Sequence, residues 1–152
     1  MPRRIPWSDR LSSLPALKDH LFAYGTLMHP AVFHQVTGLQ RVAQAAMVQG
    51  YRRGAVKGAT YPAMIESAQG EVEGVVFRDL PAACWTRLDR YEGGLYRRHG
   101  CRALLEDGGS LRAQVYLLHP AYLLRLDGRD WDSVRFLDSG WRAYLEALQD
   151  RG

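Results

Sequence analysis

Residues 70–77 read Gly-Glu-Val-Glu-Gly-Val-Val-Phe and carry the clearest structural pattern in this chain. In the first half of the segment, apolar Val72 alternates with charged Glu71 and Glu73, and two further valines follow. Successive side chains of a β-strand point to opposite faces of the sheet. The alternation therefore predicts a strand with one buried face and one face in water.

Six segments in all show strand patterns, and turns that contain glycine separate several of them. They cover residues 20–24, 42–51, 61–66, 71–78, 96–105 and 111–118. The last two are joined by Glu106-Asp107-Gly108-Gly109, a sequence typical of a hairpin turn.

Three other segments have helical spacing. Residues 30–36 begin with proline, which suits the first turn of a helix, and residues 81–92 stop at Gly93, a typical C-terminal residue. Residues 131–148 carry apolar side chains three and four apart, with one of two nearby aspartates as the expected N-terminal cap. About six strands and two or three helices predict the α+β class, with a curled, mostly antiparallel sheet or a small barrel.

The chain is 152 residues long, with 47% apolar and 24% charged residues, values typical of one globular domain. This composition excludes a long disordered chain, a collagen-like repeat and a small disulfide-stapled protein. Prolines and serines break the periodicity of residues 1–19, so we expect an N-terminal extension there. Residues 20–152 are expected to form the single domain.

The basic residues give no sign of a nucleic-acid partner. The net charge is +4, and all basic residues except Lys18 and Lys57 are arginines scattered along the chain. A nucleic-acid-binding protein more often concentrates its basic residues in one dense stripe with aromatic residues between them. We therefore expect no nucleic acid as a partner.

The sequence also predicts a location in the cytoplasm, away from membranes. Residues 21–40 lack charged side chains but contain histidine, glutamine and glycine, which makes them too polar for a membrane span. Residues 1–20 have no continuous apolar run of the kind found in a secretory signal. Cys84 and Cys101 are then expected to stay reduced.

The common cofactor and metal motifs are missing from the sequence. It contains no GxGxxG, Walker A, HExxH, CxxC or GxSxG pattern. His29 and His34 are five residues apart, a spacing that does not place two imidazoles on one helix face. We therefore expect neither a metal site nor a cofactor.

Two segments are candidates for chemistry, and the first is Tyr24-Gly25-Thr26-Leu27. A strand that opens through glycine into a turn exposes consecutive backbone N–H groups, which can hold a carboxylate or an oxyanion. The alternative interpretation is an ordinary strand-to-helix turn in which the glycine supplies a positive φ.

The second candidate is Glu92. Trp85, Leu88 and Glu92 are spaced i, i+3 and i+7, which places the carboxylate on the apolar stripe of its helix. Burial and the nearby helix C-terminus would both raise its pKa above the ordinary value of about 4.3. Such a carboxyl suits a general base that later acts as general acid. The alternatives are an ion pair with Arg97 or Arg98, or exposure at a frayed helix end.

Together these segments resemble the γ-glutamylcyclotransferase-like (AIG2-like) superfamily. Tyr24-Gly25-Thr26-Leu27 is similar to its YG[ST]L signature, and residues 88–98, Leu-Asp-Arg-Tyr-Glu-Gly-Gly-Leu-Tyr-Arg-Arg, are similar to its LDxxEG…YxR segment. Tyr61-Pro62-Ala63-Met64 and residues 72–77 resemble two of its strands. Residues 131–136 are similar to the C-terminal helix of its plant members. Phe77 stands where many relatives have tyrosine.

The resemblance implies a small β-barrel of about six strands flanked by helices. It also implies an intramolecular acyl transfer, in which the α-amine of a γ-glutamyl group attacks its own γ-carbonyl. The products are 5-oxoproline and a free amine or amino acid, and no cofactor or metal takes part. Glu92 matches the catalytic glutamate of the family.

The same resemblance implies a binding role for the Tyr24–Leu27 loop. Tyr96 and Tyr116 are candidates for pocket walls or hydroxyl donors, and the alternative for each is a tyrosine at the edge of the core. The arginines of residues 51–54 and 96–98 are expected at the pocket mouth. The alternatives are a non-catalytic small-molecule-binding module on the same fold and an arginine-mediated interaction protein. The sequence leaves the leaving group and the oligomeric state open.

Overall fold

The computed structural model describes residues 19–151 of the chain. Apart from Asp19, which begins the first strand, the extension predicted over residues 1–19 lies outside the described residues. The division into this extension and one domain stays a prediction.

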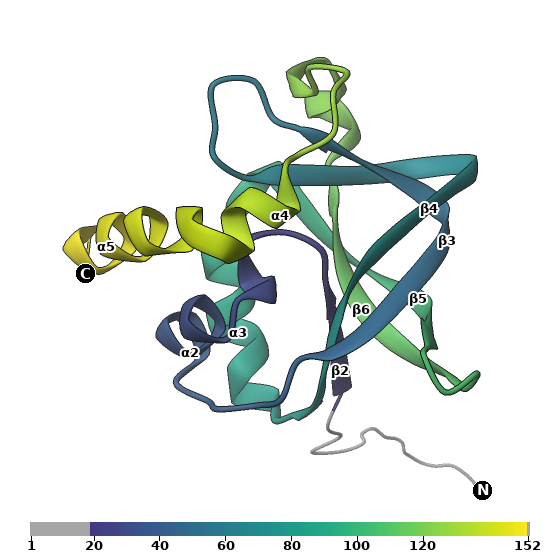
Figure 1. The fold of residues 1–152 in the computed structure, drawn as a ribbon, viewed down its shortest axis with the longest axis horizontal. Helices are drawn as coiled ribbons and strands as arrows, with labels where there is room; N and C mark the ends of the chain where they lie inside the picture. Colours follow the sequence, from purple (N-terminus) through teal and green to yellow (C-terminus); the bar gives the residue numbers. More distant parts are fainter. Residues whose placement is uncertain (1–18, 152) are drawn as a thin grey trace, which may run out of the picture.

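One sheet organises the described residues, and its five strands are joined in the order β2-β4-β3-β5-β6 (Figure 1). The strands are β2 (Asp19–Ala23), β3 (Gln44–Ala55), β4 (Pro62–Leu80), β5 (Tyr96–Leu105) and β6 (Ser110–Leu118). Neighbours in this order are antiparallel, while Leu21 of β2 also pairs in parallel with Gln114 of β6 and closes the sheet on itself as a barrel.

The sheet has five strands where the sequence predicts about six. The segments predicted as separate strands, 61–66 and 71–78, are both parts of the continuous strand β4. The two segments form one strand because β3 pairs with β4 on both sides of the expected turn. The register of this pairing shifts between Gln49 and Tyr51 of β3. A bulge of this kind absorbs the extra residues without ending the strand.

The helices confirm the α+β class. They are α2 (Pro30–Thr37), α3 (Ala82–Glu92), α4 (Ser133–Arg135) and α5 (Trp141–Arg151), with short 3-10 segments at Thr26–Met28, Gly93–Leu95 and Pro120–Arg125. The helix predicted over 131–148 is confirmed as a continuous helical run from Ser133 to Arg151, in which a wider π-type turn at Phe136–Gly140 joins α4 to α5. Of the two candidate aspartates, Asp132 is the cap, since its side chain accepts a hydrogen bond from the N–H of Arg135.

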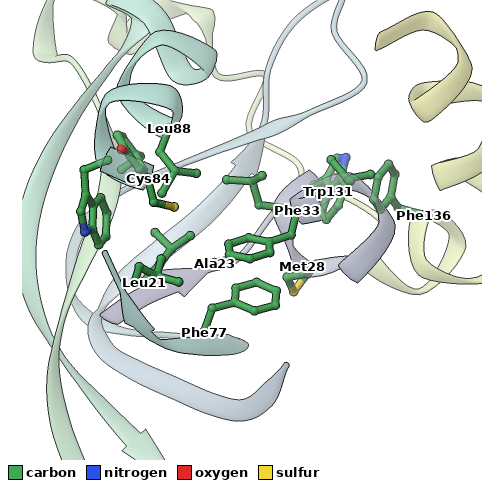
Figure 2. Packing of buried hydrophobic residues seen from close by; sticks show 14 residues of the cluster. Leu21, Ala23, Met28, Phe33, Phe77, Cys84, Leu88, Trp131 and Phe136 are labelled. Atoms are coloured by element: carbon green, nitrogen blue, oxygen red, sulfur yellow. The ribbon is translucent and has the colours of Figure 1, made fainter. Parts of the chain in front are cut away.

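The helices α2, α3 and α5 lie together on one side of the closed sheet (Figure 1). Apolar side chains fill the space between helices and sheet, where Phe33 of α2 stacks on Phe77 of β4 with ring centroids 4.0 Å apart (Figure 2). A second buried cluster, which includes Phe22, Met64 and Val115, joins side chains of β2, β4 and β6. Within residues 19–151, no helix is long and apolar enough to cross a membrane.

Candidate active site

A cavity of about 670 Å³ lies where the end of β2, the end of α3 and the C-terminal segment meet. All seven residues that the sequence nominates for the site line this cavity. They are Tyr24, Gly25, Thr26, Leu27, Glu92, Tyr96 and Tyr116. The fold therefore brings two segments about 65 residues apart in the chain to one place.

The Tyr24–Leu27 loop leaves the sheet directly after β2. The hydroxyl of Tyr24 donates a hydrogen bond of 2.6 Å to the carbonyl of Tyr116, which ties the loop to β6. A positive φ at Gly25 is not the reason for its glycine, because φ is −127° there. A Cβ at this position would lie 2.9 Å from the ring of Pro62, so the loop needs a residue without a side chain.

The loop begins a short 3-10 helix, and the first N–H groups of a helix have no partner within it. Among the turn and loop hydrogen bonds of residues 19–151, none uses the N–H of Thr26 or Leu27 as donor. These groups lie in the cavity lining and are available to an anionic ligand.

A chain of hydroxyl groups connects the loop to two helices. The Thr26 hydroxyl is 2.8 Å from the Tyr91 hydroxyl of α3, which in turn bonds to the hydroxyl of Tyr144 on α5. Tyr91 and Tyr144 also line the cavity, although no sequence motif marks them as site residues. In the sequence, Tyr144 is one of the apolar residues spaced three and four apart in residues 131–148. It therefore looks like an ordinary core residue of that helix.

Glu92 is the last residue of α3, and Gly93 ends the helix with a φ of 70°. The carboxyl group is partly exposed to the cavity, while the protein around it removes most of the bulk water. This burial, followed by the negative charge of Asp89 one turn earlier, raises the pKa of Glu92 to about 8. Within the described residues, no side chain donates a hydrogen bond to the carboxyl or forms an ion pair with it.

Of the two arginines considered as alternative partners of Glu92, Arg98 binds Asp89 instead. The Nε of Arg98 lies 3.1 Å from Asp89 Oδ1, and the Tyr116 hydroxyl donates to the same oxygen at 2.7 Å. The hydroxyl of Tyr96 donates to the carbonyl of Pro62 at 2.7 Å. Burial raises the pKa of both tyrosines above the ordinary value, so both are neutral donors.

The arginines expected at the pocket mouth do not line the cavity. Arg53 is held by other partners, since its guanidinium donates to the carbonyl of Tyr24 at 3.0 Å and to the carboxylate of Asp130 at 2.9 Å. Arg53 supports the backbone of the loop rather than a ligand. The arginine that does line the cavity is Arg135, which follows the cap of α4.

Comparison with known proteins identifies the family to which this arrangement belongs. The family described as "Gamma-glutamyl cyclotransferase, AIG2-like" matches residues 21–133, most of the chain. This chain is a member of that family. The family resemblance stated from the sequence motifs is thus confirmed.

Two relatives of this cyclotransferase-family member are similar to it over most of their own length. AIG2-like protein B of Arabidopsis thaliana is 27% identical over 145 residues, which cover 91% of this chain and 80% of the relative. A solution structure of another Arabidopsis thaliana protein has a TM-score of 0.69 at 24% identity and covers 93% of this chain and 86% of its own. A structure named gamma-glutamyl cyclotransferase has a TM-score of 0.59 at 21% identity, with 68% of each chain covered. These structures share the fold.

The raised pKa of Glu92 predicts how the stability of this family member depends on pH. Between pH 4.5 and about 8 the folded protein keeps the Glu92 proton while the unfolded chain has lost it. The proton held by Glu92 therefore contributes to the free energy of unfolding. This contribution is fully present below the window and is lost as pH rises through it, with a slope of at most about 1.4 kcal/mol per pH unit. Urea unfolding of the wild type and of Glu92→Gln across this window measures the difference. Parallel pH dependences would contradict the assigned pKa.

Proposed function

We propose that this protein is a γ-glutamyl cyclotransferase that releases 5-oxoproline and an amine or amino acid from a small γ-glutamyl substrate. One observation carries the proposal. A carboxyl group with a pKa near 8, free of hydrogen bonds from the described residues, shares a cavity with a loop whose N–H groups are available. The first group can move protons near neutral pH, and the second can hold negative charge.

The reaction requires one proton acceptor that later becomes a proton donor. The ionised carboxylate of Glu92 takes a proton from the α-ammonium group of the substrate, and the freed amine attacks the γ-carbonyl carbon. A new C–N bond closes the five-membered ring, and the C–N bond to the leaving group breaks. Glu92 then gives its proton to the leaving nitrogen. The ring nitrogen still carries one hydrogen too many after the attack, and the restored carboxylate takes this second proton and passes it to the departing amine, which leaves as an ammonium ion. The lactam nitrogen of 5-oxoproline keeps one hydrogen, and Glu92 ends as the carboxylate that it was at the start.

The loop and the surrounding hydroxyl groups supply orientation and electrostatics. The N–H groups of Thr26 and Leu27 bind the glutamyl group through its carboxylate or through the oxyanion that forms during attack. Tyr96 and Tyr116 form neutral walls beside Glu92. Holding the substrate curled contributes several kcal/mol, because an intramolecular attack needs the amine close to the carbonyl.

Turnover of a defined substrate panel tests the proposal. The purified protein is incubated with γ-glutamyl amines and γ-glutamyl dipeptides, and 5-oxoproline and the released amine are quantified together. We expect the two products in equal amounts from at least one compound. Binding of these compounds without any turnover would overturn the proposal in favour of a non-catalytic binding module on the same fold.

Asp89→Asn is expected to shift the activity profile to lower pH. The negative charge of Asp89 raises the pKa of Glu92, and its removal also frees the positive charge of Arg98. Both changes lower the pKa of Glu92. The midpoint of the rising limb of kcat/KM, near pH 8 in the wild type, therefore moves to lower pH. Asp150→Asn, an exposed acid on α5 that does not line the cavity, is the matched control. An unshifted limb in Asp89→Asn would mean that Asp89 does not tune the base.

A further inference from the structure

The cavity extends beyond Glu92 and the loop to a second wall, which the C-terminal segment builds. This wall is largely apolar and aromatic, with Trp131, Phe136, Tyr144 and Leu148 in the lining. A cavity of about 670 Å³ is in the range of pockets that bury a drug-sized ligand. It therefore has room for a leaving group in addition to the glutamyl group.

One positive charge stands on this wall. Among the cavity-lining residues, all of which lie within residues 19–151, Arg135 is the one arginine, lysine or histidine. Its backbone N–H donates to Asp132 Oδ1 at 3.0 Å, which fixes its position in the first turn after the cap. The same bond occupies one carboxylate oxygen of Asp132, the second acid in the lining.

The guanidinium of Arg135 is exposed and forms no ion pair or hydrogen bond with any described side chain. This distinguishes it from its counterparts nearby, since Arg53 is paired with Asp130 and Arg98 with Asp89. An unpaired guanidinium beside an apolar wall suits a ligand that carries a carboxylate next to an apolar group. Guanidinium and carboxylate match in a two-point hydrogen-bonded geometry.

We propose that Arg135 binds the carboxylate of the leaving group, which makes γ-glutamyl amino acids with apolar or aromatic side chains the substrate class, in preference to γ-glutamyl amines. The proposal rests on the proposed function. The family match ends at residue 133, so it does not include Arg135 or most of the second wall. Asp132, the other acid beside Arg135, has one carboxylate oxygen engaged in the cap of α4.

Two compounds that differ in one group test this assignment. γ-Glutamyl-phenylalanine and γ-glutamyl-phenethylamine share the glutamyl group and the aromatic ring, and only the first carries a carboxylate on the leaving group. We expect the wild type to prefer γ-glutamyl-phenylalanine in kcat/KM. In Arg135→Gln this preference falls about tenfold or more, as expected for the loss of a charge-assisted hydrogen bond. Arg90→Gln, which removes an exposed charge from α3 outside the lining, leaves the preference unchanged.

Binding measured without turnover separates this proposal from the proposed function. In a Glu92→Gln background, calorimetric titration compares the affinities of the two compounds with and without Arg135→Gln. We expect the affinity for γ-glutamyl-phenylalanine alone to fall about tenfold. Absence of turnover in the wild type would overturn the proposed function. An unchanged ratio of affinities in Arg135→Gln, with its thermal unfolding unchanged, would overturn the role of Arg135.

Discussion

Glu92→Gln is expected to lower kcat/KM for any accepted γ-glutamyl substrate by about 10²- to 10⁴-fold. The amide has nearly the shape of the carboxyl group but neither accepts the ammonium proton nor returns it to the leaving nitrogen. Because Glu92 accepts no hydrogen bond from a described side chain, its replacement leaves no donor there without a partner. The rate of 5-oxoproline formation, measured at saturating and at limiting substrate, gives the loss.

The matched control for this variant is Glu73→Gln, because Glu73 is an exposed glutamate of β4 outside the cavity lining. It should retain wild-type activity. If Glu92→Gln binds substrate, unfolds like the wild type and still forms 5-oxoproline at an undiminished rate, the general base is a different group.

Gly74→Ala is expected to destabilise the fold by about 3 kcal/mol, at the upper end of the usual cost of overpacking. A Cβ on Gly74 would lie 2.3 Å from the carbonyl oxygen of Ala23 and 2.8 Å from the ring of Phe22. These atoms belong to β2, which pairs with β4 at this point, and the oxygen is backbone that cannot turn away. Denaturant unfolding of both proteins at one pH measures the loss.

Gly100→Ala in β5 provides the comparison. There an added Cβ would meet only the end of the Arg112 side chain, at 3.8 Å. Glycine weakens a strand relative to alanine by roughly 0.5–1 kcal/mol, so this variant is expected to equal or exceed the wild type in stability. Equal unfolding free energies for the two glycine variants would show that β2 moves freely away from β4. Since β2 carries the Tyr24–Leu27 loop, Gly74→Ala is also expected to weaken substrate binding.

The sequence by itself determined the features that depend on neighbours along the chain. The alternation in the first half of residues 70–77 places Val72 inside and Glu71 and Glu73 outside, as the structure shows. Helical spacing likewise predicted that Glu92 lies on the apolar stripe of α3, and glycine after it predicted the helix end. Strand and helix periods are fixed by backbone geometry, so the face on which a side chain lies can be worked out locally.

Only the tertiary structure decided which distant groups meet. The two predicted strands became one because β3 continues past the expected turn, and the predicted C-terminal helix widens into a π-type turn at Phe136–Gly140. Likewise, Arg98 binds Asp89 rather than Glu92. The hydrogen bond between Tyr91 and Tyr144 connects α3 to the C-terminal segment across about 50 residues. Arg135 of the same segment lines the cavity together with Glu92 of α3. Such contacts depend on how the closed sheet and the helices pack together. Periodicity along the chain carries no information about that packing.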